Sequence, residues 1–133
     1  MMPFFIHESL LIKKSKNKGR GIFTKKPIAA QTIIEVAPVI VMDKNNRALL
    51  DKTLLHDYIF EWGNEREQCC MALGWVAIYN HSYKSNCEYE MHFTQQTIAV
   101  KTVRAIKQGE ELLINYNGDW DNEKKVWFEA TAP

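Results

Sequence analysis

The sequence lacks the features that mark several large classes of protein. It holds no run of 18 apolar residues, so we expect no membrane-spanning helix. Its opening apolar stretch is short and has no cationic start, unlike a secretory signal peptide. The formal net charge is only +1, whereas proteins that bind nucleic acid usually have a strong basic excess. We therefore expect a soluble, intracellular, cytoplasmic protein that does not bind nucleic acid directly.

Cysteine is scarce and poorly placed for metal binding. The three cysteines are Cys69, Cys70 and Cys87. Adjacent cysteines rarely bridge each other, no CxxC pair occurs, and no cluster of Cys and His has the spacing of a zinc site. An odd and sparse cysteine count is typical of a reducing compartment. We predict that the protein has no metal site.

One segment departs from the even balance of charge. Residues 13–20 hold four lysines and one arginine and no acidic residue. One interpretation is a solvated basic loop, and the other is a contact with an acidic ligand or partner. Elsewhere the composition is ordinary, with 46% hydrophobic and 25% charged residues. A chain of 133 residues with this composition predicts one globular domain, spanning residues 1–133.

The spacing of apolar residues predicts a mostly β domain with one main helix. Strands are expected at residues 9–13, 97–103 and 111–116 and in the apolar stretch 32–42. Because proline cannot donate to a strand ladder, we expect Pro38 to divide that stretch into two strands. Residues 88–93 alternate between polar and apolar side chains, and with residues 97–103 they form a predicted hairpin.

Residues 47–60 change to helical spacing. Five apolar side chains share one face of the predicted helix: Leu50, Leu54, Leu55, Tyr58 and Ile59. Residues 69–79 fit a short helix or a buried strand equally well. The tail from residue 119 has capping acceptors that would suit a short helix.

Three short segments carry candidate chemistry. Residues 18–23 read Lys-Gly-Arg-Gly-Ile-Phe, in which the glycines let the backbone approach a ligand closely. Residues 79–86 read Tyr-Asn-His-Ser-Tyr-Lys-Ser-Asn, and an asparagine side chain offers both donor and acceptor to an amino-acid or adenine ligand. Residues 109–116 read Gly-Glu-Glu-Leu-Leu-Ile-Asn-Tyr, a polar turn and a buried strand that ends in tyrosine. Each segment alone also fits an ordinary turn or core strand.

Together and in this order, the three segments resemble the SET-domain family of protein-lysine methyltransferases. The resemblance covers about residues 8–120 and is strongest to the short, stand-alone members of bacterial or viral type; residues 119–133 are left as a short C-terminal tail. Some positions depart from the family pattern. Tyr83 and Ser85 replace the usual cysteine and proline, Gln31 replaces a frequent glycine, and Val36 replaces an aromatic residue that often forms one wall of the lysine channel.

The resemblance implies a fold of small curved sheets around a pseudoknot. In that fold the segment after the third motif passes under the loop that carries the second, which would bring Asn80 and His81 close to Tyr116. It also implies S-adenosylmethionine as the cofactor. Arg20 and the glycine backbone beside it would contact the methionine part, Asn80 and His81 would hold the amino-acid and adenine ends, and Trp120 would cover the adenine. The implied cofactor-binding residues are Lys18, Gly19, Arg20, Gly21, Asn80, His81 and Trp120.

The family likeness also implies a narrow channel for the substrate lysine. Tyr116 would be the catalytic residue, and Tyr89, Ile114 and Tyr58 would line the channel. Tyr58 or Phe60 would stand in for the aromatic missing at residue 36. Tyr89 either limits the number of methyl groups added or is a plain core residue of the hairpin. No dedicated general base is expected, because a dry channel beside a sulfonium cation lowers the pKa of the substrate lysine.

The implied partner is a protein or peptide that carries a lysine. A second interpretation stays open, in which the chain is a non-catalytic SET-like protein-interaction module, since fold does not fix function. We also predict a homodimer that involves the C-terminal tail, because that tail is rich in large apolar residues. The alternative is a monomer whose tail folds over its own adenine site.

Overall fold

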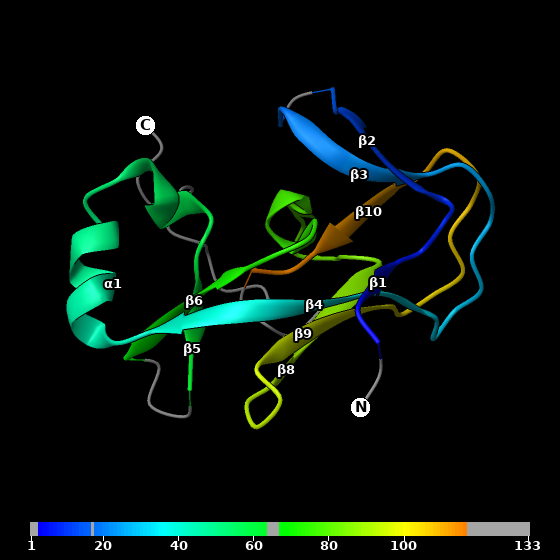
Figure 1. Cartoon of the computed structure of the whole chain (residues 1–133). Coiled ribbons are helices and arrows are strands. Elements are labelled where there is room, and N and C mark those ends of the chain that lie inside the picture. Colours follow the sequence, from blue (N-terminus) through cyan, green and yellow to red (C-terminus); the bar gives the residue numbers. More distant parts are fainter. Residues whose placement is uncertain (1–2, 17, 64–66, 117–133) are drawn as a thin grey trace.

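The computed structural model describes residues 3–16, 18–63 and 67–116, and it is built mainly from short strands (Figure 1). One α-helix and two short 3-10 helices interrupt them. In chain order the elements are β1 Phe5–Ile6, β2 Leu10–Lys14, β3 Arg20–Thr24, β4 Ile33–Met42, α1 Lys44–Leu50, η1 Leu54–Asp57, β5 Phe60–Trp62, β6 Gln68–Ala72, η2 Val76–Ile78, β7 Asn80–His81, β8 Cys87–His92, β9 Thr97–Thr102 and β10 Glu111–Ile114. The predicted mostly β class is confirmed.

The larger sheet is organised around the long strand β4, which runs across the molecule in Figure 1. Its strand order is β5-β6-β4-β9-β8, and β1 also pairs with β4. The first half of β4 pairs with β9 as far as Pro38↔Thr97, and the second half pairs with β6 from Val39↔Ala72. The hairpin of β8 and β9 is the one expected from the alternating pattern.

The expected break at Pro38 is wrong, because β4 continues through it as one strand. The Pro38 carbonyl accepts a hydrogen bond from Leu73 N–H (3.0 Å), so it faces the edge of β4 that pairs with β1 and β6, just beyond the end of β6. On that edge the first residue of β1, Phe5, lies opposite Val36, and the last residue of β6, Ala72, lies opposite Val39. The missing N–H of proline therefore falls in a gap between two partners and costs no ladder hydrogen bond.

The single helix expected over residues 47–60 is also wrong. Asp43 caps α1 by accepting from Asn46 N–H (2.8 Å), and Thr53 then caps the separate η1 by accepting from Leu55 N–H (3.2 Å). Short polar side chains that bond nearby backbone favour such helix starts over helix interiors. Neither helix buries a residue, and Leu54 stays 74% exposed. Helical spacing shows that side chains share a face, but it does not supply a surface to cover them.

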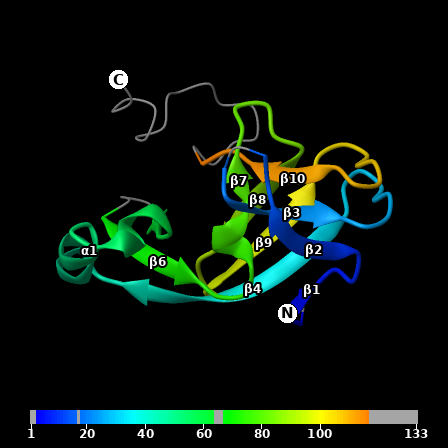
Figure 2. The same ribbon diagram turned by 90° about the horizontal axis from the view of Figure 1, so that it is seen from above.

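The smaller sheet has the order β2-β3-β10-β7 and lies at the opposite end of the molecule from α1 (Figure 2). The two sheets enclose a core of fully buried aliphatic side chains, among them Ile22, Ile34, Val76, Ile98, Val100, Leu112 and Ile114. Residues 69–79, which fitted helix and strand equally, contain most of β6 and all of η2.

The pairing of β10 with β7 joins two segments that lie more than thirty residues apart. The strands are parallel, with Leu113↔Asn80 and Ile114↔His81 in register. The loop that follows β7 also grips β10, because Asn86 donates to the Glu111 carbonyl and accepts from Leu113 N–H, both at 2.8 Å. The loop of the second motif thus holds the strand of the third, as expected for the pseudoknot. The rest of the crossing lies beyond Tyr116, outside the described residues.

Candidate active site

A cavity of about 360 Å³ opens where the smaller sheet meets η1 and η2. Its volume falls within the range of about 300–1,000 Å³ typical of small-molecule sites. It is lined by residues from four parts of the chain: Lys18, Gly19, Arg20, Asp57, Tyr58, Ala77, Ile78, Asn80, His81 and Tyr116. Residues from all three predicted motifs therefore meet at one place.

The first motif reaches the cavity through the turn between β2 and β3. Gly19 adopts a left-handed conformation (φ 73°), and its carbonyl accepts from Ser15 N–H at 2.6 Å. A side chain added at Gly19 would meet no atom within 4 Å, so its backbone faces open space. Lys18 bridges to the second motif, since its ammonium donates to the His81 carbonyl (2.6 Å). The basic segment noted in the sequence thus turns Lys18 and Arg20 toward this cavity.

Gly21 has a different role from the one expected of a flexible turn, because it lies within β3 with ordinary strand geometry. A methyl group there would collide with the Glu111 carboxylate and lie 2.8 Å from the Asn80 amide nitrogen. That space lets Asn80 donate to the Arg20 carbonyl (3.2 Å) and to Glu111 (2.8 Å). Gly21 does not line the cavity, and it serves the site by admitting these two side chains.

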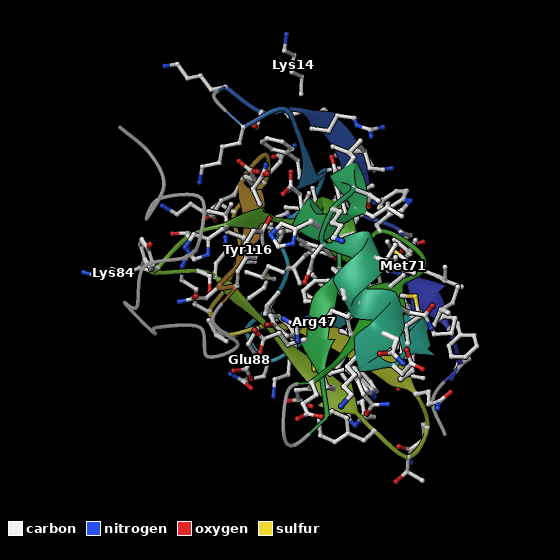
Figure 3. All side chains as sticks on the ribbon, turned by 90° about the vertical axis from the view of Figure 1, so that its left-hand side faces the viewer. Lys14, Arg47, Met71, Lys84, Glu88 and Tyr116 are labelled. Atoms are coloured by element: carbon white, nitrogen blue, oxygen red, sulfur yellow. The ribbon has the colours of Figure 1, made fainter. Side chains whose placement is uncertain are left out.

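Tyr116 follows β10 and lies at the junction of the second and third motifs; Figure 3 labels it there. Its backbone N–H donates to His81 Nδ1 at 3.0 Å, and its hydroxyl donates to the Tyr79 carbonyl at 2.8 Å. The rings of His81 and Tyr116 lie 5.0 Å apart, centroid to centroid. Because His81 Nδ1 accepts a hydrogen bond, that nitrogen carries no proton.

The Tyr116 hydroxyl stays protonated over the ordinary pH range. Burial, aided by the negative charges that Tyr58 and Glu111 can carry, raises the pKa of Tyr116 to about 12. A neutral phenol donates its hydrogen to the Tyr79 carbonyl, and its oxygen is chemically able to accept a hydrogen bond as well. Tyr116 is therefore suited to orient and to accept weak C–H···O contacts, and is not suited to remove a proton.

The predicted channel residues are only partly brought together. Tyr58 lines the cavity from the end of η1. Tyr89 is not among the lining residues; its hydroxyl is 3.4 Å from the Tyr116 carbonyl, and its ring is 5.3 Å from that of Phe60 in an edge-to-face contact. Ile114 is fully buried in the core and does not line the cavity.

Two further positions complete the comparison with the predicted channel. Val36 is buried between β1 and β9, so it forms no wall of the cavity. The cavity lining instead contains the aromatic side chain of Tyr58. Trp120, expected over the adenine, lies outside the described residues.

Three lining residues were missed by the sequence reasoning: Asp57, Ala77 and Ile78. They come from η1 and η2, which carry no motif. A fourth omission is Glu35, a fully buried carboxyl in β4. Its signal was a single acidic residue inside the apolar stretch 32–42. Among residues 3–16, 18–63 and 67–116 no group of three or more His, Cys, Asp or Glu side chains is placed to hold a metal ion.

Comparison with known proteins agrees with this geometry. The sequence-family model of the SET domain matches residues 19–117 of this chain. The chain belongs to the SET-domain family. It is 34% identical over 128 residues to a histone-lysine N-methyltransferase of Schizosaccharomyces pombe that is specific for lysine 37 of histone H3, with 96% of this chain and 82% of that protein covered. This SET domain is a protein-lysine methyltransferase, of a family that uses S-adenosylmethionine. The non-catalytic interpretation is therefore not supported.

Solved SET-domain structures share the fold. A Plasmodium falciparum chain assigned as a histone methyltransferase superposes with a TM-score of 0.68 and 27% identity, covering 88% of this chain and all of that one. A chain of a humanized Polycomb Repressive Complex 2 from Chaetomium thermophilum, bound to an inhibitor, gives a TM-score of 0.69 at 18% identity. It covers 87% of this SET domain and 16% of the larger chain. In the described part of the chain, no helix is long and apolar enough to cross a membrane.

Proposed function

We propose that this SET domain binds S-adenosylmethionine in the cavity beside Tyr116 and methylates a lysine in a histone tail. The observation that carries the proposal is the convergence of Arg20, Asn80, His81 and Tyr116 on one cavity, although they lie as far apart as residues 20 and 116. Such clustering of polar groups from separate elements in a single pocket is typical of a ligand site.

The residues present fit the amino-acid end of the cofactor. Lys18 and Arg20 offer positive charge to a carboxylate, and the open backbone of Gly19 permits close approach. Asn80 uses its amide hydrogens on Arg20 and Glu111, and no partner for its Oδ1 is found within residues 3–16, 18–63 and 67–116. That oxygen would accept from the ammonium group. Trp120 remains our prediction for the adenine cover, and Gly21 supports the site from behind.

The chain's own residues would prepare the substrate lysine. Neutralising a lysine at pH 7.4 costs roughly 4 kcal/mol, from a reference pKa of about 10.4. Tyr58 and Tyr116 give the cavity an aromatic wall, and displacement of water from it by the bound substrate and cofactor would favour the neutral amine. Asp57 places a carboxylate on the lining that would attract the incoming ammonium, although the same charge opposes its neutralisation. The bound cofactor supplies an activated methyl group on a sulfonium sulfur, and the Tyr116 hydroxyl oxygen is placed to accept C–H···O contacts from it.

The histone assignment rests on the fission-yeast relative, which is named for lysine 37 of histone H3. Identity of 34% over 96% of this chain supports a similar substrate class. A histone substrate favours a compartment that contains chromatin over the cytoplasmic location expected from the sequence. Both locations remain predictions.

The test is methyl transfer from radiolabelled S-adenosylmethionine to synthetic histone H3 peptides. We expect label on a peptide centred on lysine 37 and none on the same peptide with arginine at that position. The control is a scrambled peptide of identical composition. Transfer to an unrelated protein in preference to every histone peptide would overturn the histone substrate. Failure of S-adenosylmethionine to raise the melting temperature would overturn the cofactor site.

A further inference from the structure

A buried carboxyl lies behind the cavity and touches none of the predicted site residues. Glu35 is the third residue of β4, with 0% of its surface exposed. Its Oε2 accepts from Trp75 N–H at 2.7 Å, and its Oε1 accepts from the Tyr79 hydroxyl at 3.1 Å. On β1 and β9 its partners are Ile6 and Val100, neither of which ionises. Both carboxyl oxygens therefore hold one segment, residues 75–79, at its two ends.

The backbone before that segment is fitted closely to Glu35. Gly74 has a left-handed conformation (φ 68°), and a methyl group on it would collide with Glu35 Oε2 and lie 3.4 Å from the Ala37 side chain. Glycine is therefore required both by conformation and by space. Between the two hydrogen bonds lies η2, whose Ala77 and Ile78 line the cavity.

Tyr79 connects this anchor to the site. Its side chain is almost fully buried and its hydroxyl bonds Glu35. Its carbonyl, at the other end of the same residue, accepts from the Tyr116 hydroxyl at 2.8 Å. Since a peptide plane can tilt about its neighbouring bonds, a buried side-chain hydrogen bond restricts where this carbonyl points.

We propose that Glu35 and Tyr79 are positioning residues for methyl transfer, which act by fixing the Tyr79 carbonyl and, through it, the Tyr116 hydroxyl. The proposal rests on the proposed role of Tyr116 but not on the identity of the substrate. Neither hydrogen bond of Glu35 involves Arg20, Asn80 or His81, so we expect the loss of the anchor to disturb alignment more than binding. A misplacement near 1 Å costs about a hundredfold in rate, so a loosened anchor is expected to cost about tenfold.

The kinetic test is a double-mutant cycle with Tyr79→Phe and Tyr116→Phe. Tyr79→Phe removes only the hydroxyl that reaches Glu35, and we expect kcat to fall about tenfold with both KM values within twofold of wild type. In the Tyr116→Phe background it should have no further effect, because the group it positions is gone. An equal loss in both backgrounds, or wild-type kcat for Tyr79→Phe, would overturn the proposal.

The matched control is Thr24→Val, far along β3 from the cavity. Thr24 is also buried, and its hydroxyl donates to the Lys26 carbonyl at 2.6 Å. This variant loses a buried hydroxyl hydrogen bond without touching residues 75–79. We expect its kcat to stay within twofold of wild type, and a tenfold loss would mean that any buried hydrogen bond has the effect seen for Tyr79.

A second measurement needs no turnover. With tyrosine labelled by ¹³C at Cζ, the Tyr116 signal is the one that disappears in Tyr116→Phe. We expect it to shift in Tyr79→Phe and to stay in place in Thr24→Val, because the Cζ shift responds to hydrogen bonding of the phenol. An unmoved Tyr116 signal in Tyr79→Phe would overturn the anchor even if the enzyme methylates no known peptide. A moved signal without methyl transfer would instead count against the proposed function alone.

A pH profile tests Glu35 itself. Burial raises the pKa of Glu35 to about 7, opposed by its hydrogen bonds from Trp75 and Tyr79. Above that pH both oxygens accept, whereas below it a carboxyl proton competes with the two donors. The titratable groups nearby are Tyr79 and, beside Tyr79, Cys87, and burial raises the pKa of both so that they titrate only at higher pH.

We expect the ratio of kcat for wild type to that for Glu35→Gln to rise between pH 6 and pH 8. Ionisation of the substrate lysine affects both enzymes alike and cancels in this ratio. A ratio that stays constant across the range would show that the Glu35 carboxylate has no influence on transfer.

Discussion

Tyr116 is the residue on which the chemistry of the site depends. Its N–H is tied to His81, its hydroxyl is tied to the Tyr79 carbonyl, and burial holds its pKa near 12. These contacts leave it as a fixed, neutral phenol in the wall of the cavity. A group of this kind aids a reaction by its position and its lone pairs, because neither changes during the step.

Tyr116→Phe is therefore expected to keep the fold and the affinity for S-adenosylmethionine and to lose methyl transfer by roughly a hundredfold, the usual cost of one electrostatic contact to the reacting group. The substitution removes one oxygen and little volume. Transfer is measured with radiolabelled cofactor, and affinity by calorimetry. Activity within twofold of wild type would contradict the role of the hydroxyl.

A substitution at Tyr89 tests the predicted substrate channel next to Tyr116. The Tyr89 hydroxyl is 3.4 Å from the Tyr116 carbonyl and its ring packs on Phe60. Tyr89→Phe removes this hydroxyl, and with it a hydrogen-bonding anchor beside Tyr116 that would restrict the amine in the proposed channel. We expect a shift toward di- and trimethylated product, read by mass spectrometry. An unchanged product ratio would make Tyr89 a core residue of the hairpin and nothing more.

The buried carboxyl of Glu35 also predicts how the free energy of unfolding depends on pH. Its pKa is raised in the folded state to about 7 from an ordinary value of 4.5, so it stabilises the fold only while protonated. That contribution is complete below about pH 4.5 and is lost as the pH rises to 7. Between pH 5.5 and pH 8 the wild type should lose about 2 kcal/mol of unfolding free energy from this residue, since each pKa unit is worth about 1.4 kcal/mol.

Urea unfolding at the two pH values measures this loss, and Glu35→Gln should not show it. Glu110 does not interfere, because its hydrogen bonds from Arg104 lower its pKa to about 2 and place its effect in the acid range. If wild type and Glu35→Gln change in parallel from pH 5.5 to pH 8, the carboxyl does not titrate in that window.

At the scale of elements, the parts of the fold that the sequence predicts well are those whose pattern is local. The β8–β9 hairpin has alternation and a short turn, and β10 follows a glycine turn at residue 109 (φ 81°). The helical segment 47–60 failed because Thr53 starts a second, separate helix. The expected break at Pro38 was wrong because β4 changes its pairing partner there. The residues around Pro38 carry no local pattern that indicates such a change of partner.

Asn80 connects three strands. It is the first residue of β7, and its amide donates to the Arg20 carbonyl on β3 and to the Glu111 carboxylate on β10. Asn80→Ala should weaken S-adenosylmethionine binding about tenfold, as expected for one lost hydrogen bond of about 1.4 kcal/mol. Calorimetry measures the affinity and thermal unfolding checks the fold. The control is Asn45→Ala on the exposed face of α1. Equal affinity for wild type and Asn80→Ala would mean that the second motif is not a ligand loop.

At the scale of the whole molecule, the site exists only because β10 is gripped between β3 and the loop of residues 80–86. The three motifs and their order made the cavity predictable through the family resemblance. What they did not predict is the lining from η1 and η2 or the burial of Ile114, because these depend on how non-adjacent elements pack. Glu35 belongs to the same class, since its partners are Trp75 and Tyr79, forty and more residues away.

The association of the domain is the last prediction at this scale. The described surface carries large apolar side chains that nothing in residues 3–16, 18–63 and 67–116 covers, including Leu49 on α1 (65% exposed) and Leu54 on η1 (74% exposed). The C-terminal tail, which is outside the described residues, adds Trp120, Val126, Trp127 and Phe128. Apolar surface of this kind favours contact with a second subunit.

We therefore predict a two-fold homodimer in which the tail takes part, with twice the chain mass of 15.5 kDa by light scattering. Deletion from Trp120 onward should return the mass to that of a monomer. The variant Leu54→Ser tests the apolar surface of η1 with the tail left intact. A monomer mass for the full chain at high concentration excludes the dimer. If the deletion then lowers only the affinity for S-adenosylmethionine, the tail covers the adenine site of its own subunit. If the deletion changes neither mass nor affinity, the tail has neither role, and the prediction for Trp120 is wrong.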